Sequence, residues 1–265
     1  MLVDSIIEKI QTLDLTLFEG IPSQTTADDR LALLAVQRVT AETHKEYDYL
    51  EIGSYLGGSI QPHLLDPRCK NISSIDSRNV KTPDDRPVGY FDYESNSSER
   101  MLELLRAIDP CEVSKLRCFD MDSSEIDPNT ITSHPQIAFI DGEHTRAAVL
   151  SDFLFCKKVL SNDGTILFHD FRIIYPAIIE ICKALNKSKR HYKALKFRDN
   201  VFAIFFDEGK IHSDPYLSRT YALNRHAFAI FRLKEWIKNF LPAFVLNVLR
   251  SARRKVARTD NVCCR

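Results

Sequence analysis

Short apolar runs alternate with longer segments of helical spacing along most of the chain. Two amphipathic helices are expected before the first apolar run, and Thr26 is a suitable N-cap for the second because Asp28 and Asp29 follow in its first turn. Five apolar runs then alternate with helical segments, and two further runs on either side of residues 198–200 indicate a β-hairpin. The five runs are YDYLEI, NISSI, KLRCF, PQIAFI and GTILF.

This alternation predicts an α/β fold with a doubly wound, Rossmann-like and mostly parallel seven-stranded sheet, helices on both faces and a terminal antiparallel hairpin. Residues 1–231 are expected to form this domain, with the N-terminal helices of residues 1–45 included. The polar residues 79–98, which contain two prolines, predict a long loop. Pro176 is expected in the first turn of the helix YPAIIEICKALNKSK.

The overall composition is that of an ordinary globular protein, with 44% apolar and 27% charged residues. The formal net charge of zero gives no sign of a nucleic-acid partner. Seven cysteines without C-x-x-C spacing argue against a disulfide framework or a structural zinc site and suit a reducing compartment, so we expect a cytoplasmic protein. The N-terminus lacks a signal-peptide pattern, and no apolar run approaches the roughly 20 residues that span a bilayer.

Residues 232–265 form a basic tail with roughly nine Lys and Arg against two acids. Apolar residues at helical spacing in this tail, flanked by the basic residues, predict an amphipathic helix. Three interpretations remain open for its apolar face: peripheral contact with the inner face of an anionic membrane, a contact in a homo-oligomer, or packing against the core. The paired Cys263 and Cys264 are candidate lipidation sites.

Three of the eight glycines, Gly53, Gly57 and Gly58, directly follow the first apolar run. In parallel sheets ligands bind beyond the carboxyl ends of the strands where the strand order reverses, and glycines there let the backbone approach the ligand. The pattern E-x-G-x-x-x-G-G-S differs from the dinucleotide motif and from the phosphate loop. Its spacing suits a ligand with an amino-acid end and a nucleoside end.

At these residues the chain resembles the class I S-adenosylmethionine (SAM)-dependent methyltransferases, over roughly residues 47–206. The resemblance implies that the glycine turn holds the methionine end of SAM, that the acid after the second run binds the ribose, and that residues after the third run contact the adenine. The residues it assigns to SAM are Glu51, Gly53, Ser54 and Gly57 for methionine, Asp76 for ribose, and Asp122 and Ser123 for adenine. Asp141 is a further candidate for binding the cofactor.

Polar residues end the fourth and fifth apolar runs, in FIDGEH and LFHD. Because parallel strands end on one edge of a sheet, these side chains are expected to converge. Carboxylates and imidazoles gathered there are costly unless they are paired, solvated or ligating, and such a set suits Mg²⁺ or Mn²⁺. The expected cluster comprises Asp141, Glu143, His144, His169 and Asp170.

This segment is similar to the family-24 methyltransferases and, more distantly, to metal-dependent macrolide-sugar and aminocoumarin O-methyltransferases. The resemblance implies that Asp141 and Asp170 ligate Mg²⁺, and it makes His169, which stands where those relatives carry an acid, the third candidate ligand. The general base of those relatives follows the first aspartate by two or three residues, which leaves Glu143 or His144. His144 is preferred because an ordinary histidine pKa near 6.5 suits a base at neutral pH.

The sequence therefore predicts a SAM-dependent O-methyltransferase that needs a divalent metal and acts on a hydroxyl of a sugar or a glycosylated small molecule. Two alternatives remain: a hydroxylase-like or N-methylating relative on the same fold, and a non-catalytic SAM-binding subunit of a glycan-assembly complex. The acids and the candidate base at the strand ends favour an enzyme, since a binding module has no need of them.

Overall fold

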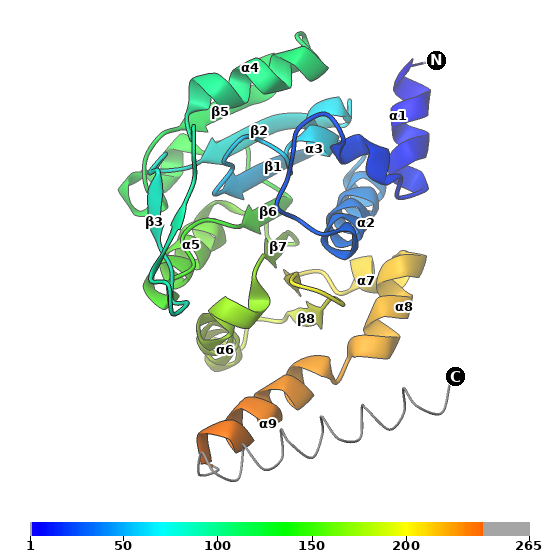
Figure 1. Cartoon of the computed structure of the whole chain (residues 1–265). Helices are drawn as coiled ribbons and strands as arrows, with labels where there is room; N and C mark the ends of the chain where they lie inside the picture. Colours follow the sequence, from blue (N-terminus) through cyan, green and yellow to red (C-terminus); the bar gives the residue numbers. More distant parts are fainter. Residues whose placement is uncertain (1, 241–265) are drawn as a thin grey trace, which may run out of the picture. The chain divides into compact units, whose positions relative to one another are not determined.

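The structure is a computed structural model that describes residues 2–240 (Figure 1). Seven strands form one sheet in the order β5-β2-β1-β6-β7-β9-β8. Neighbours among β5, β2, β1, β6 and β7 are parallel, whereas β9 is antiparallel to both β7 and β8. The predicted fold class is confirmed, including the terminal hairpin. The strands are β1 Tyr47–Ile52, β2 Cys69–Ile75, β5 Leu116–Phe119, β6 Ile137–Ile140, β7 Thr165–Phe168, β8 Lys193–Lys196 and β9 Phe202–Phe205.

Helices cover both faces of this sheet, and the direction of side chains alternates along each strand. Phe139 of β6 and Leu167 of β7 belong to the core cluster that includes α2. On the other face, Phe168 of β7 lies against Phe153 of α5, with ring centroids 6.4 Å apart. The α-helices up to residue 224 are α1 Leu2–Gln11, α2 Ala27–His44, α3 Gln61–Leu65, α4 Ser98–Ile108, α5 Arg146–Val159, α6 Phe171–Lys187, α7 Gly209–Ser213 and α8 Pro215–Asn224.

Two local predictions about helices have different outcomes. The N-cap of α2 is confirmed, because Thr26 accepts a bond from the backbone N–H of Asp29 while the Asp29 carboxylate accepts one from the N–H of Thr26. The position of Pro176 was wrong: α6 begins at Phe171, so the proline lies inside the helix.

The predicted long loop of residues 79–98 was also wrong in part, since it contains a second, two-stranded antiparallel sheet. Strand β3 (Lys81–Pro83) pairs with β4 (Tyr90–Asp92), and Gly89 has a φ of +78° in the connection between them. Two prolines concealed this hairpin in the sequence. A two-stranded sheet has only edge strands, which tolerate proline.

The first compact unit ends at Asn224, and helix α9 (Ala227–Phe240) belongs to a second unit. A helix is therefore present in the described part of the predicted tail. Residues 241–265, with Cys263 and Cys264, lie outside the described residues, and the interpretations of the tail stay predictions. Over residues 2–240, we find no helix with the length and apolar character needed to cross a membrane.

Candidate active site

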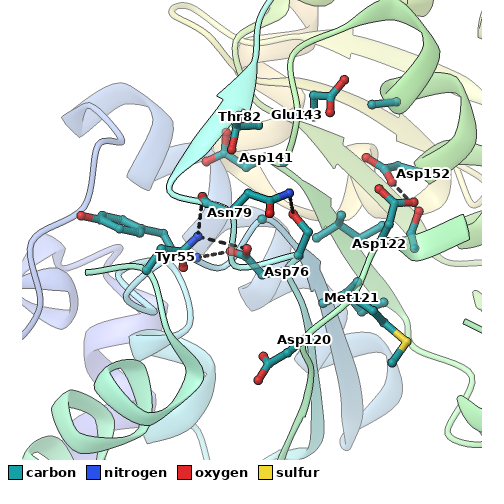
Figure 2. A pocket seen from close by; sticks show the side chains of 18 of the residues that line it. Tyr55, Asp76, Asn79, Thr82, Asp120, Met121, Asp122, Asp141, Glu143 and Asp152 are labelled. Carbon is teal, nitrogen blue, oxygen red and sulfur yellow. Dashed lines mark hydrogen bonds between the residues drawn. The ribbon is translucent and has the colours of Figure 1, made fainter. Parts of the chain in front are cut away.

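The main cavity lies at the carboxyl ends of the parallel strands and has a volume of about 470 Å³. Its walls come from the ends of β1, β2, β5 and β6 and from α5, and Figure 2 shows Asp76, Asp122, Asp141 and Asp152 around it. The strand order reverses between β1 and β6, so the cavity lies at the switch point where open α/β sheets bind ligands.

A smaller cavity of about 40 Å³ adjoins the main one on the side of the glycine turn. Ser54 and Ser59 line it, together with residues 22–24 of the segment before α2. The residues that line both cavities are Gly53, Tyr55, Tyr93 and Asp141. The two spaces therefore meet at the ends of β1 and β6.

A glycine is required at position 53, where the two cavities meet, because of its backbone conformation and its close contact with Asp141. Its φ is +88°, and an added Cβ would lie 2.3 Å from the carbonyl oxygen of Asp141. The group that approaches Gly53 closely is therefore the backbone of Asp141. Gly57 also has a positive φ, of +83°, but lines neither cavity and packs against Met101.

Glu51 lies beneath the glycine turn, fully buried and outside both cavity linings. Its carboxyl group accepts hydrogen bonds from the hydroxyls of Tyr49 at 2.5 Å and Ser59 at 2.6 Å. Burial raises the pKa of Glu51 to about 8. The structure thus connects Glu51 to the smaller cavity through Ser59, and the predicted role of Glu51 toward methionine stays a prediction.

Asp76 ends β2 and lines the main cavity, as the ribose prediction requires. Its carboxylate already accepts bonds from the backbone N–H groups of Tyr55 and Arg78, both at 2.8 Å, and from the side chain of Asn96 at 3.2 Å. A carboxylate has about four lone-pair sites, so about one remains for a ligand hydroxyl.

The residues predicted beside the adenine, Asp122 and Ser123, line the main cavity after β5. Asp122 caps the short 3₁₀ helix Ser123–Glu125 by accepting from the N–H of Ser124 at 2.8 Å. The Ser123 hydroxyl donates to Asp152 of α5 at 2.5 Å. This end of the cavity therefore joins the β5 loop to α5.

Asp141, His144, His169 and Asp170 converge as predicted, and we call these four residues the aspartate–histidine cluster. The Nδ1 atom of His144 lies 3.3 Å from a carboxylate oxygen of Asp84 in the β3–β4 hairpin. Its Nε2 atom lies 3.6 Å from Asp141 and 3.5 Å from Asp170, and it is buried without a hydrogen-bond partner in the described structure. Burial lowers the pKa of His144, but the surrounding carboxylates outweigh burial and raise it.

His169 is held by carboxylates at both ring nitrogens. Nδ1 lies 3.0 Å from Asp141 and Nε2 lies 3.3 Å from Asp29, the third residue of α2 and the partner of its N-cap Thr26. Burial opposes the charge of His169, but these carboxylates outweigh burial and raise its pKa to about 11. The raised pKa favours the imidazolium form of His169, and its ring bridges β7, the end of β6 and α2.

Asp170 has a left-handed backbone, with a φ of +48°, at the N-cap position of α6. Its side chain does not cap the helix and is turned toward the two histidines instead. Uncommon backbone conformations of this kind gather at functional sites. Glu143 lies apart from the cluster, accepts from the hydroxyl of Thr145 at 2.5 Å and lines the main cavity.

Residues 50–171 match the sequence model of the family-24 group, described as a methyltransferase domain. Together with the sheet order and the cavity at its switch point, this match identifies the matched segment. Residues 50–171 form a methyltransferase domain. A similar curated protein is the uncharacterized protein R132 of Acanthamoeba polyphaga mimivirus, 26% identical over 158 residues. That match covers 59% of this chain and 65% of the length of the relative.

Solved methyltransferases share the fold of this domain at low sequence identity. The O-methyltransferase NovP matches with a TM-score of 0.54 and 15% identity over 78% of this chain and 98% of its own. The calicheamicin methyltransferase CalS11 matches with a TM-score of 0.51 and 14% identity over 75% of this chain and 91% of its own.

The metal that the resemblance implies does not fit the methyltransferase domain as its side chains are placed. His169 has a carboxylate at each ring nitrogen, and its raised pKa favours the ring that is protonated at both nitrogens, which has no lone pair for a metal. Among residues 2–240, no group of three or more His, Cys, Asp or Glu side chains is arranged to hold a metal ion. We therefore derive no catalytic step from a metal.

Sequence reasoning missed the partners of three carboxylates of this site. Asp84 was assigned to a loop, Asp29 only to the first turn of α2, and Asp152 to no function. Each lies far along the chain from its partner, 60 residues for Asp84 and His144 and 140 for Asp29 and His169. The one signal in the sequence was that Asp29 and Asp152 are acids beside apolar stretches, where a buried acid requires a partner, whereas Asp84 lies in a polar segment that gave no such signal.

Proposed function

We propose that the protein is an O-methyltransferase that moves the methyl group of SAM to a hydroxyl of a sugar or a glycosylated small molecule. The observation that carries the proposal is the place where the two cavities meet. SAM is a nucleoside and an amino acid joined at a sulfonium sulfur. With the nucleoside in the main cavity and the methionine end in the smaller one, the sulfur belongs beside Asp141, which lines both.

This placement brings the reacting methyl group to the aspartate–histidine cluster. Bound SAM supplies an electrophilic methyl on its sulfonium sulfur. Asp141 is partly open, with its side chain 20% exposed, and it lies 3.6 Å from the unpartnered Nε2 of His144. An acceptor hydroxyl that lies against Asp141 is therefore within reach of that nitrogen.

His144 is the residue that takes the hydroxyl proton in this proposal. The acceptor oxygen bonds to the methyl carbon as the carbon–sulfur bond breaks, and the proton moves from oxygen to Nε2 of His144. Asp84 accepts from the Nδ1–H of His144 and so keeps Nε2 free as the accepting nitrogen. Holding the acceptor in line with the methyl group supplies the remaining catalysis.

The sugar acceptor rests on the resemblance and on the polar character of the surroundings. Tyr93 lines both cavities beside Asp141, and the acids Asp84 and Asp85 follow β3 in the neighbouring hairpin. Carboxylates beside an aromatic ring suit an acceptor rich in hydroxyls. NovP, which shares this fold, is an O-methyltransferase, and this supports an oxygen acceptor.

The test combines cofactor binding with methyl transfer in the full chain. Calorimetry is expected to detect binding of SAM and of its product S-adenosylhomocysteine, with NAD as the control ligand. Transfer of labelled methyl is then measured on a panel of nucleotide sugars and glycosides, each with hydroxyl-only and amino-sugar members.

His144→Asn is the decisive variant, because Asn can still donate to Asp84 but has no counterpart of Nε2. It is expected to bind S-adenosylhomocysteine as the wild type does and to lose about 10²–10⁴-fold in transfer rate. Glu143→Gln is the matched comparison and is expected to lose less. Absence of SAM binding, or full transfer by His144→Asn, would refute the proposal, and transfer to amino groups alone would favour the N-methylating alternative.

A further inference from the structure

Asp152 is a buried acid of the main cavity to which the mechanism gives no role. It lies on α5, is 4% exposed and is drawn beside Asp122 in Figure 2. Its Oδ1 atom accepts from the Ser123 hydroxyl at 2.5 Å, and the described residues supply no second hydrogen bond and no cation to the carboxyl group. A buried polar group with spare bonding capacity, in the wall of a cavity, is expected to meet a ligand.

The charged groups that face Asp152 are both acids. Asp122 faces it from the loop after β5 and Glu143 from the loop after β6. Burial, reinforced by these two charges, raises the pKa of Asp152 to about 7. Below that pH, Asp152 is a neutral carboxylic acid, which offers an acceptor and a donor side by side.

We propose that Asp152 recognises the amino edge of the adenine ring of SAM and is the residue that selects adenine over other bases. The inference rests on the proposed function, which puts the nucleoside of SAM in the main cavity, and on the predicted contact of Asp76 with the ribose. The cavity lined by Asp76 is also lined by Met121, Ser123 and, on α5, Asp152. The base attached to that ribose therefore reaches the α5 wall.

The chemistry of the two partners is complementary. Adenine presents its amino group, a donor, next to the ring nitrogen N1, an acceptor. Amide side chains pair with a donor–acceptor edge of this kind through one acceptor and one donor. The protonated carboxyl of Asp152 provides the same pair: its carbonyl oxygen accepts from the amino group and its hydroxyl donates to the ring nitrogen. The carbonyl oxygen has a second lone pair for Ser123. An ionised Asp152 would set an acceptor against the ring nitrogen.

The experiment compares two ligands that differ only at this edge, S-adenosylhomocysteine and S-inosylhomocysteine. In the inosine analogue an oxygen replaces the amino group and the neighbouring ring nitrogen carries hydrogen, so donor and acceptor are exchanged. Their dissociation constants are measured by calorimetry at pH 6 and pH 8 for the wild type, Asp152→Asn, Asp152→Ala and the control Glu125→Gln. Glu125 is another acid that lines the cavity, and the amide oxygen of Gln can still accept the hydrogen bond from the backbone N–H of Asp122.

The wild type at pH 6 is expected to bind the adenosine ligand at least 10-fold more tightly than the inosine ligand, in line with the discrimination of a bidentate contact. Raising the pH to 8 is expected to weaken the adenosine ligand by up to about 10-fold, because Asp152 ionises. Asp152→Asn keeps a donor and an acceptor at both pH values, so it is expected to keep the preference and lose the pH dependence. Asp152→Ala is expected to lose the preference, and Glu125→Gln to behave as the wild type.

The outcomes separate this inference from the proposed function. Equal binding of the two ligands by the wild type, or an unchanged preference in Asp152→Ala, overturns the role of Asp152 and leaves the methyltransferase proposal intact. Failure of all variants and of the wild type to bind S-adenosylhomocysteine overturns the proposed function itself. Thermal melting of each variant shows whether a loss of binding comes from a loss of fold.

Discussion

Asp29 holds together three segments that are distant in the sequence, and its replacement by Asn tests the electrostatics of the site. Its carboxylate accepts from Nε2 of His169 at 3.3 Å, from the backbone N–H of Asn200 at 2.9 Å, and from the N–H and hydroxyl of Thr26 at 3.1 and 2.8 Å. The side chain is fully buried. Asp29→Asn keeps the size and a cap acceptor but removes the charge that faces the His169 imidazolium.

The pKa of Asp29 and the cost of breaking a buried ion pair together set the size of the expected loss of stability. The pKa of Asp29 is lowered from 3.8 to about 2 despite burial, by the bonds to His169, Thr26 and Asn200. That difference corresponds to roughly 2–3 kcal/mol. Removing one partner of a buried ion pair typically costs about 3–5 kcal/mol, but His169 keeps Asp141, so a smaller loss is expected. We expect the free energy of unfolding at pH 7 to fall by about 2–4 kcal/mol.

The neighbouring residue supplies a matched control, since Asp28→Asn removes the same charge from the same helical turn. Asp28 faces Arg198 at 3.5 Å, and their side chains are 36% and 83% exposed. Exposed pairs of this kind contribute about 0–1 kcal/mol. Urea unfolding of the full chain is followed by circular dichroism for the wild type and both variants.

The pH dependence gives an independent check of the same reasoning. Because the pKa of Asp29 is lower in the folded state, its contribution is present above pH 3.8 and is lost as the pH falls through about 2. The stability difference between wild type and Asp29→Asn is therefore expected to shrink between pH 4 and pH 2. A difference at pH 7 no larger than that of Asp28→Asn, or one that does not shrink in acid, would refute the ion-pair account.

Further predictions concern the cofactor turn, the base and the metal. Asp76→Asn is expected to weaken binding of S-adenosylhomocysteine by about 1.5–3 kcal/mol in calorimetry, whereas Asp120→Asn on the same cavity is expected to change it little. Gly53→Ala is expected to destabilise the fold more than Gly89→Ala in urea unfolding. Both positions have a positive φ, but only the Cβ at Gly53 meets backbone, 2.3 Å from the carbonyl oxygen of Asp141. The transfer rate is expected to rise with pH through a value above 6.5, since His144 accepts a proton only when neutral and its pKa is raised; a flat profile would argue for another base. Excess EDTA is expected to leave transfer unchanged, whereas a loss restored by Mg²⁺ or Mn²⁺ would show that the aspartate–histidine cluster rearranges around a cation.

The sequence by itself determined the sheet, its order of elements and the edge that carries the chemistry. Apolar runs such as Ile137–Ile140 are buried on both sides, and their alternation with helices favours parallel pairing. Polar residues that follow such runs, including Asp76, Asp141 and His169, must then lie on one edge. These conclusions need only periodicity and chain direction, which are local properties of a sequence.

Only the tertiary structure decided which charges meet. Asp29 caps α2 whatever its neighbours, and nothing in its surroundings along the chain indicates that it faces His169. Asp84 was predicted to lie in a loop, and in the structure the β3–β4 hairpin places it beside His144. In the sequence Asp152 is one acid of a helix, and only the structure shows that it is buried against Ser123 and that burial raises its pKa. The physical reason is that the pKa of a buried group depends on desolvation and on charges within a few ångströms, and folding brings those charges from segments that sequence periodicity does not connect.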